Sequence, residues 1–395
     1  MDDKLHIDSQ AIHGDAREDA PELSGVAPLF MTSSFGFASV EDGARISRGQ
    51  GGGHMYTRQS NPTIQRWEER IAVLEGAAGG CAAASGMGAI SGAVMHLVRA
   101  GENLIAPPTL YSGSVRFFRD ILPRYGVECR FEDVREPGAL KAAADAKTRA
   151  LYLESPDNPL LRMHDVEALV NEAHGLGLRV IFDNTFNTPL LFRPLEWGAD
   201  VVVHSATKYL SGHGHVIGGI ILARDAALLH EIHHETVYNF GATMSPFNAW
   251  LLLLSAETLP VRMKRHCETA LEIAKFLEAH AKVAWVNYPG LASHPEHSLA
   301  KRYLPGGFGG MIALGLKGGA DACSRALDAV KLVTHQVSLG DAKSLMIHPF
   351  SMMFETMPEG ERRKLGILPE MLRLSVGLED PRDLIADLAQ ALEKA

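Results

Sequence analysis

The sequence predicts an α/β protein with a mostly parallel central sheet and a smaller C-terminal α/β domain. From residue 102 to 223, short apolar segments alternate with segments of helical periodicity, which is typical of a parallel sheet with helices on both faces. Polar residues follow several of the apolar segments, at the strand ends where open α/β sheets bind ligands. From Ser245 onward, a long helical region is followed by shorter strands. We therefore expect a main domain at 59–245 and a second domain at 246–395.

The composition fits a globular protein and argues against several classes of partner. The 395 residues are 46% hydrophobic and 22% charged, enough for two domains with large cores. A net charge of -9 without a basic block gives no reason to expect binding to nucleic acid or membranes. Residues 1–14 predict no signal peptide, and the longest apolar run, 249–254, is too short to span a bilayer. Four separated cysteines are typical of free thiols in a reducing cytosol, so we expect a cytoplasmic protein.

Residues 1–58 are expected to form an arm rather than part of a core. They lack strong periodicity and include a glycine-rich run at 49–53. The end of the arm is chemically distinctive, with Tyr56-Thr57-Arg58 shortly before Asn61-Pro62-Thr63. The second motif indicates the start of a helix, because proline suits the first helical turn. That helix has one apolar face and ends at a glycine: Trp67, Ile71, Leu74 and Gly76.

A run of small residues at 82–88 follows this helix. Small residues let the backbone approach a ligand closely. The next helix, expected to reach Arg99, presents its N-terminal N–H groups at Gly86 and Met87, which is the pattern of a phosphate seat. Tight packing of a helix against the sheet explains the small residues equally well.

The strands of the central sheet are expected at apolar segments: 103–106, 128–132, 150–154, 179–182, 199–203 and 219–223. Segments between them, such as 166–174, have helical periodicity. Notable polar residues fall at the carboxyl ends of these strands: Glu154 to Asn158, Asp183 and Lys208. We therefore expect a ligand site at this edge of the sheet.

Lys208 follows the strand at 199–203, where burial disfavours a charged amine. A lysine is reasonable there if its amine is bonded, and Ser205 and Thr207 place beside it two hydroxyls that suit an anionic oxygen cluster. We infer a Schiff base between Lys208 and pyridoxal 5′-phosphate (PLP), with Ser205 and Thr207 on the phosphate. The alternative is an ordinary strand-end lysine whose amine reaches water.

Two further residues have the chemistry that PLP requires. Asp183 closes the strand at 179–182, where a carboxylate can pair with a protonated ring nitrogen and make the ring a better electron sink. An Asx turn that caps the next loop is the alternative. Tyr111 can lay its ring on the cofactor, although on its own it indicates a packed core tyrosine.

Three histidines, His204, His213 and His215, lie close to Lys208 in the sequence. Metal ligation is one interpretation of this group. No carboxylate or cysteine stands at ligand spacing, so we expect hydrogen-bonded histidines and no metal site.

The second domain is expected to begin with a helical region at 246–280, bent near Pro260. Its other elements are strands at 284–288 and 308–316, a helix at 320–332, short apolar segments at 337–339 and 345–347, a strand at 371–376 and a helix from 381. Arg373 lies among apolar residues and needs a carboxylate or phosphate partner. The α-carboxylate of an amino acid is one such partner, and an internal acidic side chain is the other.

These motifs occur together in one order along nearly the whole chain. They are Tyr56-x-Arg58 with Asn61-Pro62-Thr63, Ser85-Gly86-Met87, Tyr111, Glu154-Ser155-Pro156-x-Asn158-Pro159, Asp183-Asn184-Thr185, Ser205–Tyr209 and Leu372–Gly377. In this order the chain resembles the PLP-dependent enzymes of cysteine and methionine metabolism. The resemblance implies the type I PLP-dependent transferase fold (aspartate aminotransferase-like) and a homotetramer made of two close dimers.

The resemblance also implies a role for each site residue. Lys208 would hold PLP, Asp183 would bind its ring nitrogen and Tyr111 would stack on the ring. The phosphate would be held by Gly86, Met87, Ser205 and Thr207, and by Tyr56 and Arg58 from the neighbouring subunit. The substrate would be bound by Arg373, Ser338 and Asn158, with Tyr56 close by.

Within the family, several stretches look most like O-acetylhomoserine sulfhydrylases, with 340–349 the closest match. We therefore expect γ-replacement, in which O-acetyl-L-homoserine and sulfide or a thiol give homocysteine or methionine plus acetate. The alternatives are γ-elimination, as in methionine and cystathionine γ-lyases, and cystathionine γ-synthesis. Methionine γ-lyases usually have a cysteine where this chain has Gly113. Bulky apolar residues at 350–354 depart from the sulfhydrylase pattern and leave a larger thiol, or methionine itself, open as a substrate.

Overall fold

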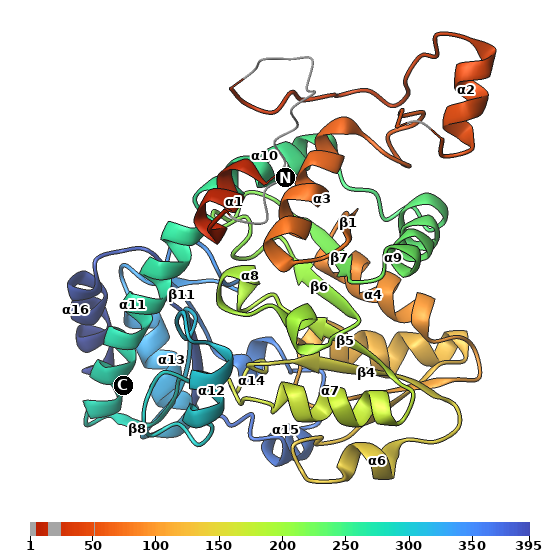
Figure 1. Ribbon diagram of the computed structural model, residues 1–395. Coiled ribbons are helices and arrows are strands. Elements are labelled where there is room, and N and C mark those ends of the chain that lie inside the picture. Colours follow the sequence, from red (N-terminus) through yellow and green to blue (C-terminus); the bar gives the residue numbers. More distant parts are fainter. Residues whose placement is uncertain (1–4, 15–24, 51) are drawn as a thin grey trace.

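The computed structural model describes residues 5–14, 25–50 and 52–395. Within these ranges the chain forms one sheet of seven strands and one of five, with helices packed against both (Figure 1). Parts of the predicted arm, at 1–4, 15–24 and 51, lie outside the described residues. Among the helices described, none has both the length and the apolar character needed to cross a bilayer.

The central sheet is mostly parallel, as the sequence predicts. Its order is β1-β7-β6-β5-β4-β2-β3, and β7 is the strand that runs antiparallel to its neighbours. The strands are β1 Gly79–Ala83, β2 Asn103–Ala106, β3 Glu128–Phe131, β4 Thr148–Glu154, β5 Arg179–Asp183, β6 Val201–Ser205 and β7 Gly219–Ala223.

Two features of this sheet differ from the prediction. The sequence does not predict β1, because Gly79–Ala83 contains no β-branched or aromatic residue. Its extended conformation comes from pairing with β7 along the whole strand. In addition, β6 continues through His204 and Ser205, which were expected just beyond the strand. Pairing with β7 also extends this end of β6.

The helices between residues 62 and 233 are α3 Pro62–Glu75, α4 Gly86–Leu97, α5 Ser112–Arg116, α6 Ala139–Ala143, α7 Val166–Gly175, α8 Thr188–Leu191 and α9 Ala226–His233. Shorter π and 3₁₀ turns are η1 Phe117–Ile121, η2 Leu122–Tyr125, η3 Pro194–Trp197 and η4 His234–Asn239. Helix α3 has the predicted ends. The Asn61 side chain accepts a hydrogen bond from the Thr63 N–H at 2.9 Å, and Gly76 ends the helix with φ of 73°.

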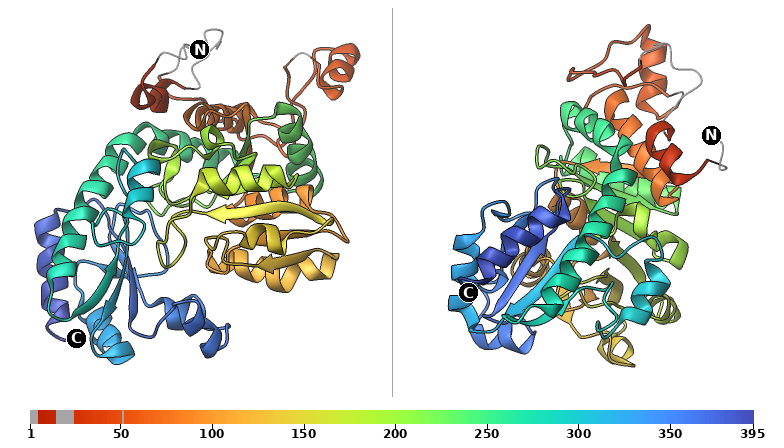
Figure 2. Two further views of the ribbon diagram at one scale, coloured as in Figure 1. Left: turned by 60° about the horizontal axis from the view of Figure 1, so that its bottom comes forward. Right: turned by 90° about the vertical axis from the view of Figure 1, so that its left-hand side faces the viewer.

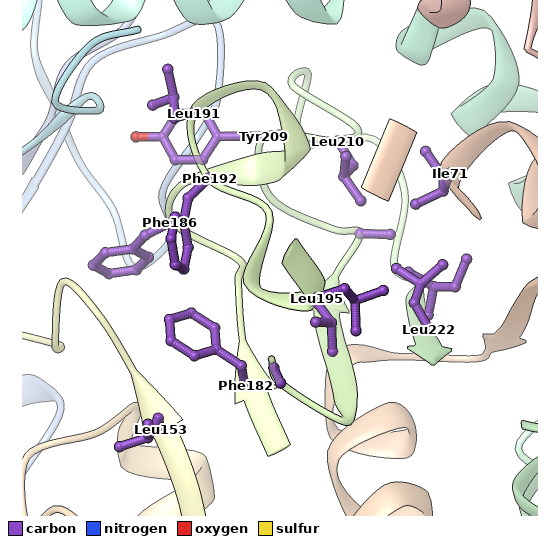
Figure 3. Packing of buried hydrophobic residues seen from close by; sticks show 14 of the residues in the cluster. Ile71, Leu153, Phe182, Phe186, Leu191, Phe192, Leu195, Tyr209, Leu210 and Leu222 are labelled. Atoms are coloured by element: carbon purple, nitrogen blue, oxygen red, sulfur yellow. The ribbon is translucent and has the colours of Figure 1, made fainter. Parts of the chain in front are cut away.

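Side chains of the central strands alternate between two apolar clusters. In β5, Phe182 lies with Trp67 and Ile71 of α3 in one cluster, and Ile181 lies with Ile90 of α4 in the other. Figure 3 shows Phe182 and Ile71 among the buried residues of the first cluster. Consecutive residues at the end of a strand therefore face opposite sides of the sheet.

The second sheet has the order β10-β11-β12-β9-β8 and is mostly antiparallel. Its strands are β8 Val283–Asn287, β9 Met311–Leu316, β10 Thr334–His335, β11 Leu345–Ile347 and β12 Met371–Ser375. The helices of this part are α10 Pro246–Glu257, α11 Leu259–Ala279, α12 His297–Tyr303, α13 Gly319–Ala329, α14 Pro349–Met352, α15 Glu359–Lys364 and α16 Pro381–Leu392.

One prediction for this part of the chain was wrong in detail. The region at 246–280 forms two helices, α10 and α11, which meet at Thr258 instead of one helix with a bend. Pro260 lies in the first turn of α11 and lacks the N–H that would continue the ladder. The short apolar segment at 337–339 lies between β10 and β11 and is not part of a strand.

In the N-terminal region, α1 Ile7–His13 packs on α3. Helix α2, Val40–Ser47, has no buried residue and stands apart from the body of the molecule (Figure 2). The Phe35 N–H donates to the Met55 backbone oxygen at 3.0 Å, so two extended segments of this region run together. The division into an arm at 1–58 and domains at 59–245 and 246–395 stays a prediction.

Candidate active site

A cavity of about 360 Å³ lies at the carboxyl edge of the central sheet, the size of a small-molecule site. Residues from both sheets line it. Of the predicted site residues, the structure brings together Gly86, Met87, Tyr111, Asn158, Asp183, Ser205, Thr207, Lys208, Ser338 and Arg373. Tyr56 and Arg58 do not line this cavity.

Lys208 follows β6, and its side chain reaches the segment between β10 and β11. Its Nζ donates a hydrogen bond to Ser338 Oγ at 3.1 Å. Burial, followed by the positive charge of Arg373, lowers the pKa of Lys208 to about 8. This lysine does not simply extend into solvent, and a larger fraction of its amine is neutral near physiological pH than in an ordinary lysine.

Asp183 is the last residue of β5 and is 6% exposed. Its Oδ1 accepts hydrogen bonds from the N–H and hydroxyl of Thr185, at 3.0 and 2.5 Å, and its Oδ2 accepts one from the Tyr152 hydroxyl at 3.2 Å. Burial raises the pKa of Asp183, and the two Thr185 bonds oppose that rise. The Asx turn considered above is therefore present, and the same carboxylate also lines the cavity.

Glu154 is a cavity residue to which the sequence analysis gave no role. It ends β4, and its Oε2 accepts a hydrogen bond from the Tyr111 backbone N–H at 2.9 Å. Burial and the neighbouring Asp183 raise the pKa of Glu154 well above its usual range. The sequence could have indicated Glu154 as a site residue, because it ends an apolar strand just as Asp183 does.

The Tyr111 side chain is 39% exposed and is not a core tyrosine. Its ring lies over Gly113. A Cβ at that position would be 2.4 Å from Tyr111 Cε1. The absence of a side chain at Gly113 therefore leaves room for the Tyr111 ring in this position.

The predicted phosphate seat lies at the start of α4. Ser85 caps this helix, accepting a hydrogen bond from the Gly88 N–H at 3.0 Å. A Cβ at Gly86 would be 2.6 Å from Ser205 Cβ, so only glycine lets α4 approach β6 this closely. Thr207 accepts a hydrogen bond from the Gly218 N–H at 3.1 Å. Free N–H groups at a helix start and two nearby hydroxyls suit an anion.

Arg373 is buried in β12, and its guanidinium contacts two other predicted site residues. Nη1 donates to Asn158 Oδ1 at 2.9 Å, and Nη2 donates to the Ser338 backbone oxygen at 3.2 Å. Burial lowers its pKa to about 10, so it stays positive at neutral pH. In the described part of the chain it forms no ion pair with an acidic side chain. This favours a carboxylate ligand over an internal salt bridge.

The three histidines near Lys208 have separate hydrogen-bond partners. His213 bonds the Ser211 backbone oxygen at 2.7 Å, and His215 bonds the Ser211 hydroxyl at 3.2 Å. His204 faces the other side of β6 and pairs with Glu75. Across the ranges that the structure describes, no cluster of histidine, cysteine and acidic side chains has the arrangement to hold a metal ion.

Tyr56 and Arg58 lie outside this chain's own cavity. The Arg58 guanidinium donates to the Tyr238 backbone oxygen and lies 5.5 Å from the ring centres of both Tyr56 and Tyr238. Tyr56 is 42% exposed. Their predicted contact with a neighbouring subunit's cofactor stays a prediction.

The residues in the cavity fit PLP. Lys208 offers an amine for the aldehyde, and Asp183 offers a carboxylate for the ring nitrogen. Tyr111 offers an aromatic face. Gly86 lets the start of α4 lie against Ser205, so the α4 N–H groups and that hydroxyl would meet the same anionic group. This set matches the aldehyde, ring and phosphate of PLP.

The chain is similar to known PLP-dependent proteins over nearly its whole length. The family model described as "Cys/Met metabolism PLP-dependent enzyme" matches residues 8–393. An L-methionine gamma-lyase of Porphyromonas gingivalis is 42% identical over 98% of this chain and 96% of its own length. A homocysteine synthase of Schizosaccharomyces pombe is 36% identical over 99% of both chains.

A solved structure gives the same result for the fold. Cystathionine gamma synthase from Xanthomonas oryzae pv. oryzae, in complex with aminoacrylate and cysteine, has a TM-score of 0.93 and 36% identity, covering 99% of this chain and 98% of that one. The predicted type I PLP-dependent transferase fold and the PLP cofactor are confirmed. The chain belongs to the Cys/Met metabolism family of PLP-dependent enzymes.

Proposed function

We propose that the protein catalyses γ-elimination on L-methionine or a closely related thioether amino acid. The reaction consumes water and releases 2-oxobutyrate, ammonia and a thiol. This differs from the γ-replacement that the sequence motifs favoured. The L-methionine gamma-lyase relative shares more identical residues with this chain than the homocysteine synthase does, at 42% against 36%.

The observation that carries the proposal is the apolar wall of the cavity. Val337, Met352 and Met353 line it together with Lys208. A methylthio group is apolar and gains free energy when it is buried against such side chains. An acetyl ester instead has a carbonyl oxygen that loses a hydrogen bond to water when it is buried against them. The wall therefore favours a thioether as the leaving group.

The other residues act on the rest of the substrate. Arg373 and Asn158 bind its α-carboxylate, because the buried guanidinium can offer a paired set of donors to a carboxylate. Lys208 removes the proton from Cα, since burial and Arg373 lower the pKa of its amine to about 8 and so make the neutral, basic form easier to reach. Ser338 orients the Lys208 amine through its hydroxyl.

The remaining roles concern the cofactor. Bound PLP supplies an electron sink for the negative charge that develops at Cα. Asp183 stabilises a positive charge on the ring nitrogen, and Tyr111 covers the ring. Gly86, Met87, Ser205 and Thr207 bind the phosphate. We also propose a homotetramer in which Tyr56 and Arg58 reach the neighbouring subunit's site.

A second candidate is γ-replacement on O-acetyl-L-homoserine with sulfide or a thiol. Gly113 favours it, because methionine γ-lyases usually have a cysteine there. A larger residue at 113 would contact the Tyr111 ring, which lies over the glycine. The relative named homocysteine synthase also covers nearly the whole chain.

The two candidates give different products from purified, PLP-loaded enzyme. L-methionine alone should yield 2-oxobutyrate and a thiol if the protein is a γ-lyase. O-acetylhomoserine with sulfide should yield homocysteine if it is a sulfhydrylase. Lys208→Ala serves as the inactive control for both. Turnover of O-acetylhomoserine with sulfide at a kcat/KM far above that for methionine would overturn the first proposal.

A further inference from the structure

The side of the central sheet opposite the cavity contains a buried polar cluster that the proposed mechanism does not use. Glu75, the last residue of α3, is fully buried. Its Oε2 lies 2.8 Å from His204 Nε2, and its Oε1 accepts a hydrogen bond from Asn184 Nδ2 at 3.3 Å. These three residues come from three elements, α3, β6 and the end of β5.

The position of this cluster follows from strand alternation. Asn184 follows Asp183, and His204 precedes Ser205. Because consecutive residues face opposite sides of a sheet, Asp183 and Ser205 face the cavity while Asn184 and His204 face α3. Glu75 therefore contacts the residues directly adjacent to two of the proposed cofactor ligands.

A carboxylate in this place is costly for stability. It lies at the C-terminal end of a helix, where the helix dipole disfavours negative charge. Burial raises the pKa of Glu75, and the hydrogen bond and charge of His204 oppose this rise. Asn184 also donates to the Phe192 backbone oxygen at 2.7 Å and accepts from Asn187 at 3.1 Å, so Glu75 joins a wider buried network.

The ends of β5 and β6 are also linked by hydrogen bonds on the side of the sheet that faces the cavity. The Ser205 N–H donates to Thr185 Oγ1 at 2.8 Å, and Thr185 in turn binds Asp183. The backbone links them as well, because the Asn184 N–H donates to the Val203 backbone oxygen at 3.0 Å. On the opposite side of the sheet, Glu75 links His204 of β6 to Asn184 at the end of β5.

We propose that Glu75 is a positioning residue that, through His204 and Asn184, holds Asp183 and Ser205 at the separation needed for PLP. The inference rests on the proposed roles of Asp183 and Ser205. Glu75 does not touch the cofactor in this account. Its effect on PLP affinity therefore has to pass through the two strand ends.

The test measures the PLP dissociation constant of folded apoenzyme, by quenching of its tryptophan fluorescence. Glu75→Ala should weaken PLP binding by about tenfold, a typical effect of residues that orient a ligand-binding group. Glu75→Gln retains the shape and an acceptor for Asn184, so it should restore most of the affinity. Glu69→Gln, in the same helix, is the matched control and should bind PLP as the unsubstituted protein does.

A purely structural role makes a different prediction. It would lower the melting temperature of Glu75→Ala apoenzyme but leave the dissociation constant of the folded fraction unchanged, and that result would overturn the proposal. If Glu75→Ala does not fold, His204→Gln and Asn184→Ala decide by the same criterion.

A double-mutant cycle tests the route through Ser205. If Glu75 acts by placing Ser205, then Ser205→Ala should cost less PLP affinity in the Glu75→Ala background than in the unsubstituted protein. Additive losses would contradict this route. The PLP dissociation constants are measured without turnover. They can therefore be interpreted even if the proposed γ-elimination is wrong, because that proposal is tested by the released products.

Discussion

Lys208 and Ser338 meet across the boundary between the two sheets, with Nζ of the lysine 3.1 Å from Oγ of the serine. The backbone oxygen of the same serine accepts a hydrogen bond from Arg373 at 3.2 Å. One residue thus contacts both the amine proposed to act on Cα and the guanidinium proposed to bind the carboxylate. The two contacts use different atoms, so substitution can separate them.

Ser338→Ala should lower kcat more than it raises KM. The substitution removes the hydroxyl that holds Nζ but keeps the backbone oxygen that contacts Arg373. Loss of one such hydrogen bond costs about 1 kcal/mol, or about fivefold in rate. Steady-state kinetics with the preferred substrate measure both constants. A large rise in KM with unchanged kcat would place the hydroxyl in the carboxylate site instead.

Capture of PLP by apoenzyme should depend on pH with a midpoint near the pKa of Lys208, which is lowered to about 8. The reactive form is the neutral amine, so capture should be slow below this pH and faster above it. Burial is the main cause of the shift, and the charge of Arg373 adds to it. Arg373→Met removes a positive neighbour, which makes protonation of Lys208 easier and should move the midpoint to higher pH. Stopped-flow absorbance measures the rate, and a midpoint that does not move would contradict the contribution of Arg373.

Much of the fold could be predicted because its signals are local. Apolar segments such as Arg179–Asp183 alternate with helical periodicity, and this pattern predicted every central strand except β1. Gly79–Ala83 has no local strand signal, because its conformation depends on pairing with β7, far away in the sequence. The break between α10 and α11 was located near Pro260 but was predicted as a bend.

The same distinction applies to the site. Lys208, Asp183 and Arg373 were found because a charged residue beside or within an apolar strand is conspicuous in a sequence. Glu75 was missed because its partner, His204, lies 129 positions away and the helix around it looks ordinary. The preferred reaction was also difficult to predict from the sequence. The apolar residues proposed to determine it, such as Val337 and Met353, come from separate loops that both line the cavity.

Gly113→Ala should disturb Tyr111 without unfolding the protein. The new Cβ would stand 2.4 Å from the Tyr111 ring, and because that ring is 39% exposed it can swing away. We expect weaker PLP binding and lower kcat, each by several-fold. Gly175→Ala, in α7, is the control, since a Cβ there has open space around it. Equal kinetics for the two variants would show that the position of the ring over Gly113 has no role.

Arg58→Ala and Lys208→Ala subunits should each be inactive alone and regain activity when mixed. Arg58 does not line its own cavity, so its proposed action is on the neighbouring subunit's site. In a mixed dimer, one site combines an intact Lys208 with an Arg58 from the other chain. Activity after joint refolding of the two variants, compared with each variant refolded alone, measures this. As a control, Lys208→Ala mixed with Asp183→Ala should remain inactive, because these two residues belong to the same chain's cavity. Failure of the first pair to regain activity, with mixed oligomers present, would place Arg58 in its own subunit's site or outside the reaction.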